Sequence, residues 1–114
     1  MAELPKPFLK FRRMNSRVAR AYDALGEASA TAGPLPEQTR ELVKLAMAIG
    51  ARLEGAVHAH VRRARAAGVT AQQIRHVVAL AAPTLGFPTT VAAFTWVEES
   101  LSSRAGRSAR QTRR

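Results

Sequence analysis

The stretch EQTRELVKLAMAIGARL, residues 37–53, decides the fold class of this chain. Its apolar side chains recur every three or four positions, as they do on the buried face of an amphipathic helix. That face carries Leu42, Leu45, Ala46, Ile49 and Leu53. Pro36 stands directly before the stretch, where a proline can occupy a first helical position. The pattern predicts a helix that begins near Glu37.

The segments on both sides of this stretch repeat the helical pattern. The expected helices run from Asn15 or Ser16 to Ala30, from Glu37 to a bend near Gly50 or Gly55, from there to Gly68, from Thr70 to near Pro83 and Gly86, and from Pro88 through Leu101. Thr70 with Gln73 three residues later fits a capping box. No alternating strand pattern, internal repeat or phosphate-binding glycine loop is visible. The sequence therefore predicts an all-α domain of about five helices.

Composition narrows the class of protein further. The chain has 114 residues, 46% of them hydrophobic, which fits one small folded domain. Much of that apolar content is alanine, so a monomeric core would be thin and we expect a homo-oligomer. The chain contains no cysteine, which excludes disulfides, thiolate nucleophiles and cysteine-bound zinc. No signal peptide or membrane span is visible, and we expect a cytoplasmic protein without membrane contact.

The formal net charge of +10 is concentrated at the two ends of the chain. Residues 1–13 hold four basic side chains and one acidic one, and residues 104–114 hold five arginines and no acid. Residues 14–103 hold nine basic and seven acidic side chains. We therefore expect a basic N-terminal arm over 1–13, a helical domain over 14–103 and a solvated, disordered tail over 104–114. The alternative, a weak contact of the tail with nucleic acid, is the less favoured interpretation.

Two histidines stand in RLEGAVHAHVRRA, residues 52–64. On a helix, residues two apart point roughly 200° apart, so His58 and His60 cannot bind one metal ion within one helix. We expect neither a metal site nor a cofactor. His60 shares its face with small apolar residues and is expected to point inward. His58 has Glu54 and Arg62 at i−4 and i+4, the spacing of a solvated ion-pair row.

The segments TRELVKLAMA, HVRRARAAGVTAQQI and GFPTTVAAF occur in the order found in carboxymuconolactone decarboxylases and alkylhydroperoxidase D-like proteins, and the chain resembles that family over about residues 35–99. The resemblance implies an all-α fold and a trimer or hexamer. Redox members carry a glutamate, a C-x-x-C pair and a histidine, which correspond here to Glu41, to Leu53 and Ala56, and to His60. Without the two thiols, a disulfide-cycling peroxidase mechanism is chemically impossible for this chain.

The decarboxylase branch does not use the cysteine pair, and its H-x-R motif corresponds to His60 and Arg62. The resemblance thus implies a candidate site of Glu41, His60 and Arg62, with Arg52, Glu54 and His58 as weaker members. In such a site an arginine would bind a substrate carboxylate, a histidine would deliver a proton, and a glutamate would orient the histidine.

Three functions remain open at this stage. The first is a lyase-like enzyme or ligand-binding protein for a small carboxylate-bearing molecule. The second is an inactive family member with a structural or interaction role, and the third is a nucleic-acid-associated protein acting through its basic ends. We expect Glu41 and His60 within hydrogen-bonding reach, directly or through one water, at the wall of a small, partly apolar cavity. The same pair packed without a cavity would favour the second function over the first.

Overall fold

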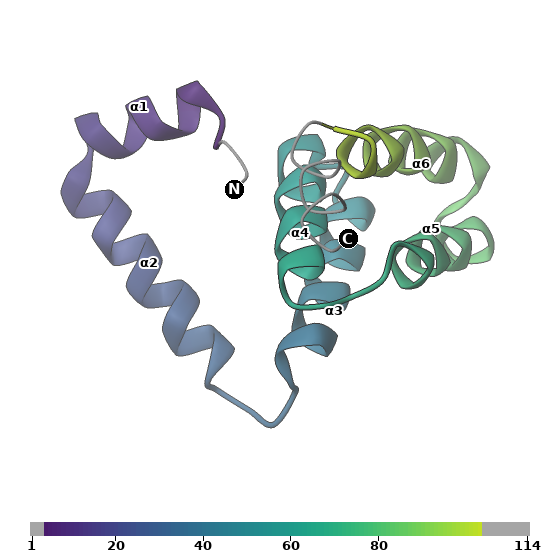
Figure 1. Cartoon of the computed structure of the whole chain (residues 1–114), viewed down its shortest axis with the longest axis horizontal. Coiled ribbons are helices and arrows are strands. Elements are labelled where there is room, and N and C mark those ends of the chain that lie inside the picture. The colour runs from purple at the N-terminus through teal and green to yellow at the C-terminus, as the bar shows by residue number, and fades with distance from the viewer. Residues whose placement is uncertain (1–3, 104–114) are drawn as a thin grey trace, which may run out of the picture. The chain divides into compact units, whose positions relative to one another are not determined.

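A computed structural model describes residues 4–103, and all regular structure within that range is helical (Figure 1). The helices are α1 (Lys6–Met14), α2 (Ser16–Ala30), α3 (Glu37–Gly50), α4 (Glu54–Ala66), α5 (Ala71–Leu85) and α6 (Phe87–Leu101). The predicted all-α fold is confirmed. No helix in this range is both long and apolar enough to cross a bilayer. The expected tail over 104–114 lies outside the described residues.

The chain divides into two units at Pro36. The first contains α1 and α2, which contact one another and are joined by an ion pair between Arg12 and Asp23. Within these two helices only Ala19 is buried, and most of the apolar side chains are exposed. Part of the expected basic arm is thus the helix α1. The predicted domain boundaries at residues 13 and 103 are separate from the division at Pro36 and stay predictions.

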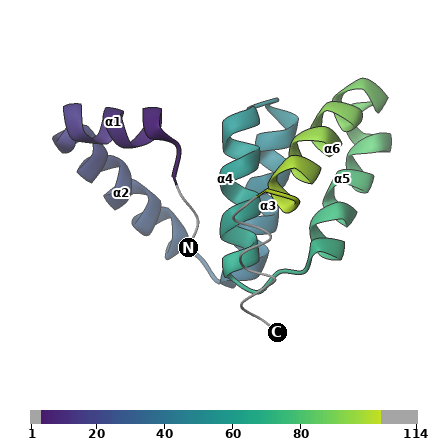
Figure 2. The ribbon, with the colours of Figure 1, turned by 45° about the horizontal axis from the view of Figure 1, so that its top comes forward.

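The second unit packs α3 to α6 around one core (Figure 2). α3 packs against α4, α5 against α6, and α4 against α6. Small and β-branched side chains dominate this core, so the helices approach one another closely. The buried residues are Leu45, Ala48, Ile49, Val57, Val61, Ala64, Val69, Ile74, Val78, Ala81, Ala93, Val97 and Leu101.

Local signals explain where these helices begin and end. The predicted capping box is present: the Gln73 backbone N–H donates to Thr70 Oγ1 at 3.0 Å, and the Thr70 N–H donates to Gln73 Oε1 at 2.8 Å. Gly68 ends the turn after α4 with a φ of 93°, which glycine adopts without strain. The bend expected near Gly50 or Gly55 lies between them, at Arg52, which has a φ of 56° although it is not a glycine.

Two polar contacts hold α3 and α4 in register as an antiparallel pair. Near the start of α3, the Gln38 side chain donates a hydrogen bond of 2.9 Å to the Ala67 carbonyl, just beyond the end of α4. That carbonyl is one of the acceptors that a helix end leaves without an intrahelical partner. One turn further along α3, Glu41 faces α4 and meets His60. The register of this helix pair therefore positions the candidate site.

Candidate functional site

Glu41 and His60 form a nearly buried pair between α3 and α4. His60 Nδ1 lies 2.9 Å from Glu41 Oε1, and the two side chains are only 13% and 14% exposed. His60 stands three residues after Val57 and four before Ala64, which are both fully buried, so its ring borders the core. Each of the two groups gives the other the hydrogen-bond partner that a polar group needs when it is buried away from water. The predicted contact is therefore present.

A hollow of about 570 Å³ lies between α3 and α5. Its wall is mostly apolar, and its polar members include His76 and Gln73. Its other lining residues are Leu42, Val43, Ala46, Ile49, Gly50, Val77, Leu80, Ala81, Thr84 and Leu85. Neither Glu41 nor His60 lines this hollow, so the expected cavity beside that pair stays a prediction.

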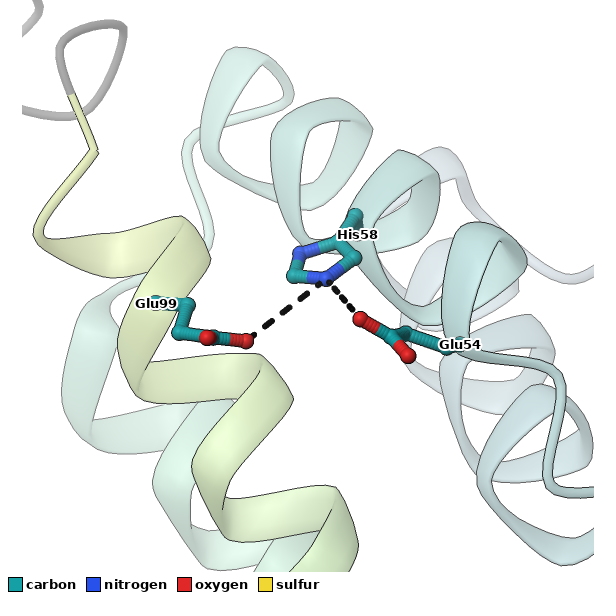
Figure 3. Close-up of side chains that lie close together, drawn as sticks. All are labelled: Glu54, His58 and Glu99. Atoms are coloured by element: carbon teal, nitrogen blue, oxygen red, sulfur yellow. Dashed lines mark hydrogen bonds and ion pairs between the residues drawn. The ribbon is translucent and has the colours of Figure 1, made fainter.

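A second histidine cluster lies on another side of α4. His58 Nε2 is 3.4 Å from Glu54 Oε2 and 4.0 Å from Glu99 Oε1 (Figure 3). Its Nδ1 contacts Ser100 Oγ. The pairing of His58 with Glu54 at i−4 agrees with the sequence pattern. The ring, however, is only 26% exposed, because α6 brings Glu99 and Ser100 against it. Sequence reasoning missed both α6 residues, since nothing in the local pattern pairs them with His58.

The arginines of the predicted site do not join the Glu41–His60 pair. Within residues 4–103, no hydrogen bond or ion pair connects Arg62 or Arg52 to either member. Arg62 is half-buried on α4, and this burial lowers the pKa of its guanidinium, as does the neighbouring charge of Arg63. Arg52 instead donates a hydrogen bond of 2.7 Å to Thr89 Oγ1, near the start of α6. The site assembled within one chain is therefore the acid–imidazole pair alone.

Comparison with known proteins identifies the family of this chain. The model of the carboxymuconolactone decarboxylase family matches residues 16–99, which include the Glu41–His60 pair. The chain belongs to this family. The match confirms the resemblance drawn from the sequence segments and covers α2 to α5 together with most of α6.

One curated relative is described as an uncharacterized protein of Haemophilus influenzae. It is 35% identical to this chain over 63 residues, which are 55% of this chain and 56% of the relative. The chain thus spans about half the length of the curated relative that it matches. No solved structure matches the chain. The comparisons therefore establish membership of the carboxymuconolactone decarboxylase family and no particular activity.

The two positions that the sequence resemblance assigns to the cysteine pair of redox members carry carbon side chains in this chain. Leu53 is 55% exposed directly before α4, and Ala56 is half-buried in its first turn. Neither side chain can form a disulfide or a thiolate, and the whole chain offers no cysteine in exchange. The chemistry available between α3 and α4 is that of a carboxylate and an imidazole. Such a pair can hold a proton and deliver it, and it needs no redox partner.

Proposed function

We propose that this carboxymuconolactone decarboxylase family member is a cysteine-independent, lyase-like enzyme for a small carboxylate-bearing molecule, with Glu41 and His60 as its acid–base pair. The observation that carries the proposal is the contact of 2.9 Å between the two nearly buried side chains. A glutamate that accepts the Nδ1 proton fixes the orientation and tautomer of the ring. Nε2 then remains as the atom that can exchange a proton with a bound molecule.

The proposed reaction needs one proton and one anion-binding group from the protein. When the bond between a carbon and its carboxylate breaks, carbon dioxide leaves and the electron pair remains on that carbon. His60 Nε2, in its protonated state, supplies the proton that this carbon takes up. Before the bond breaks, an arginine binds the carboxylate through two parallel hydrogen bonds. The atoms and electrons of this reaction balance without an oxidant or a cofactor.

Arg62 is the proposed anion-binding residue, and its position favours a site shared between subunits. It points roughly 200° away from His60 around α4, so it reaches the pair of a neighbouring subunit more easily than the pair of its own chain. A homo-oligomer in which Arg62 faces the pair of a neighbouring copy would complete the site. Exposed aromatic side chains on α6 support such assembly, since Phe87 is 71% exposed and Phe94 is 51% exposed. We propose a trimer or a hexamer.

A structural role for the pair is the second candidate. It is favoured by one observation: the apolar hollow between α3 and α5 is not lined by Glu41 or His60. In that case the two groups would only satisfy one another at the helix interface. The enzyme and the structural role predict different results for the same variant.

The test is the His60→Ala variant, with His76→Ala as its control. His76 is an exposed histidine on α5 that lies outside the proposed pair and lines the apolar hollow, so unchanged turnover in His76→Ala also separates the pair from the hollow. Purified protein is screened for carbon dioxide release from small lactone acids and β-keto acids, and its mass is measured by light scattering. We expect turnover in the wild type and in His76→Ala, and none in His60→Ala, although that variant stays assembled as a trimer or hexamer. Undiminished turnover in His60→Ala would contradict the proposal, and a loss of stability alone would support the structural role.

A further inference from the structure

Two carboxylates from different helices converge on one imidazole nitrogen, outside the Glu41–His60 pair. Figure 3 shows His58 on α4 with Nε2 directed between Glu54 of α4 and Glu99 of α6. The distances of 3.4 Å and 4.0 Å exceed the roughly 2.7–3.2 Å of a normal N–H···O hydrogen bond. The nitrogen also carries at most one proton, so it can donate a hydrogen bond to only one of the two carboxylates at a time. The arrangement therefore leaves two negative groups facing one nitrogen without a short contact to either.

The spacing of these three groups comes close to that of the ligands around a small divalent cation. One ligand atom from each residue can be chosen so that all three lie within 4.8 Å of one another. Zn²⁺ binds imidazole nitrogen and carboxylate oxygen at about 2.0–2.2 Å, which puts two ligands of a tetrahedral ion roughly 3.4 Å apart. The Glu54 and Glu99 side chains are 57% and 60% exposed and can rotate to close the remaining difference.

The orientation of the His58 ring is compatible with a metal site. Its other nitrogen, Nδ1, contacts Ser100 Oγ on α6. Histidines that bind metals usually have the second ring nitrogen bonded to a polar group, which fixes the ring and leaves one lone pair directed at the ion. If Nδ1 donates to Ser100, the lone pair of Nε2 faces Glu54 and Glu99. That arrangement is favourable when a cation lies between them.

We propose that Glu54, His58 and Glu99 bind a divalent transition-metal cation, with Zn²⁺ as the best match. One nitrogen and two oxygen ligands suit a first-row transition ion better than Mg²⁺ or Ca²⁺, which prefer shells made of oxygen alone. Three protein ligands leave at least one position for water or a small anionic ligand. The site joins the first turns of α4 to the last turn of α6. It is separate from the Glu41–His60 pair and does not rest on the function proposed for that pair.

This proposal differs from the sequence-based expectation of no metal site for an identifiable reason. That expectation considered His58 with His60, which a single helix directs apart. The ligand that completes the site comes from α6, because α6 packs against α4 in the folded unit. Only the folded chain brings Glu99 to His58.

The first experiment titrates ZnCl₂ alone into the full chain in a calorimeter, in chelator-free buffer, with MgCl₂ in a parallel titration. We expect one Zn²⁺ per chain and no comparable heat from Mg²⁺. Because an ion that binds the folded state stabilises it by mass action, Zn²⁺ should also raise the midpoint of thermal unfolding, and EDTA should reverse the rise. The absence of stoichiometric Zn²⁺ binding would overturn the proposal.

The decisive variants are Glu99→Gln and Glu54→Gln, each of which removes one carboxylate from an exposed position. We expect either change to weaken Zn²⁺ binding at least tenfold, on the order of a lost ligand contact. Glu98→Gln is the matched control, since Glu98 neighbours Glu99 on α6 but pairs with Arg75, and its Zn²⁺ affinity should equal that of the wild type. Equal affinity in Glu98→Gln and Glu99→Gln would show that Zn²⁺ binds elsewhere and would overturn the site.

Ser100→Ala tests the positioning of the ring without removing a ligand. Loss of the hydroxyl that contacts Nδ1 should weaken Zn²⁺ binding roughly tenfold, as does the loss of other groups that orient metal-bound histidines. All variants are compared by thermal unfolding in EDTA, where their midpoints should lie close to that of the wild type. If Glu99→Gln fails to fold, Glu54→Gln on the other helix supplies the same measurement.

Discussion

Two sides of α4 each carry a histidine beside a glutamate, in opposite settings. The His60 side holds one short contact of 2.9 Å between groups that are 13% and 14% exposed. The His58 side holds longer contacts to carboxylates that are 57% and 60% exposed. A nearly buried pair has little water to replace a lost partner, whereas an exposed cluster can admit water or an ion. Burial, more than residue type, therefore separates the two sides in what each can do.

The largest expected effect in this comparison is that of His60→Ala on stability. Removing the ring leaves the Glu41 carboxylate nearly buried without its partner, which costs about 1–3 kcal/mol. Urea unfolding monitored by Trp96, the only tryptophan of the chain, measures the difference at a fixed protein concentration. The double variant Glu41→Gln with His60→Ala should recover part of the loss, because the orphaned charge is then absent. A change below about 0.5 kcal/mol would mean that water reaches Glu41 freely.

The second effect, that of His58→Ala, should be smaller. Its ring is 26% exposed and contacts Ser100, so the variant loses roughly one neutral hydrogen bond, or about 1 kcal/mol. The exposed Glu54 and Glu99 can turn to water, so neither is left without a partner. The same urea experiment in EDTA measures this value. A loss as large as that of His60→Ala would abolish the distinction between the two sides.

The smallest expected effect concerns Arg75 and Glu98, an exposed ion pair between α5 and α6. Arg75 donates two hydrogen bonds to Glu98, of 2.8 Å and 2.9 Å, and these bonds lower the pKa of the Glu98 carboxyl. The side chains are 50% and 32% exposed, so solvent screening limits the pair to about 0.5 kcal/mol. Glu98→Gln should lower stability by that amount at neutral pH.

The pH dependence of this last effect has a defined sign. A carboxyl with a lowered folded-state pKa stabilises the protein above its unfolded pKa, and that stability is lost as the pH falls through the folded value. The stability difference between wild type and Glu98→Gln should therefore be constant well above the ordinary glutamate pKa of 4.5 and should decline as the pH falls below it, through the lowered folded-state pKa. Unfolding curves at pH 7 and pH 3 test this. A difference that persists in acid would assign it to packing instead of charge.

The helices of the second unit were predictable because their signals are local. The Thr70–Gln73 capping box and the apolar spacing after Glu37 each depend on residues within one or two turns. The Glu41–His60 contact was predictable for another reason: the family resemblance supplied a long-range pairing that periodicity alone does not contain. The contact of 2.9 Å between the two side chains agrees with that expectation.

Features that depend on packing or on unusual backbone were not predictable. The sequence did not predict the helix α1, to which Phe8, Leu9 and Phe11 belong, and the basic arm over residues 1–13 stays a prediction. The left-handed backbone between α3 and α4 falls on Arg52, while the neighbouring glycines were the expected positions. Glu99 lies beside His58 only because α6 packs on α4, and no local pattern encodes that contact. Contacts between residues far apart in the sequence, such as that of Glu99 with His58, are thus set by tertiary packing and not by local sequence patterns.

The two clusters also differ in the chain length that each must close during folding. Glu41 and His60 are 19 residues apart and lie in two consecutive helices, whereas His58 and Ser100 are 42 residues apart. The entropic cost of closing a loop rises by about 0.6 kcal/mol for each doubling of its length. Closing the loop between His58 and Ser100 therefore costs slightly more than that amount above the cost of closing the loop between Glu41 and His60. It also requires two helical hairpins, α3 with α4 and α5 with α6, to dock on one another. During folding, the contact of His60 with Glu41 can therefore form before α6 docks and brings Ser100 to His58.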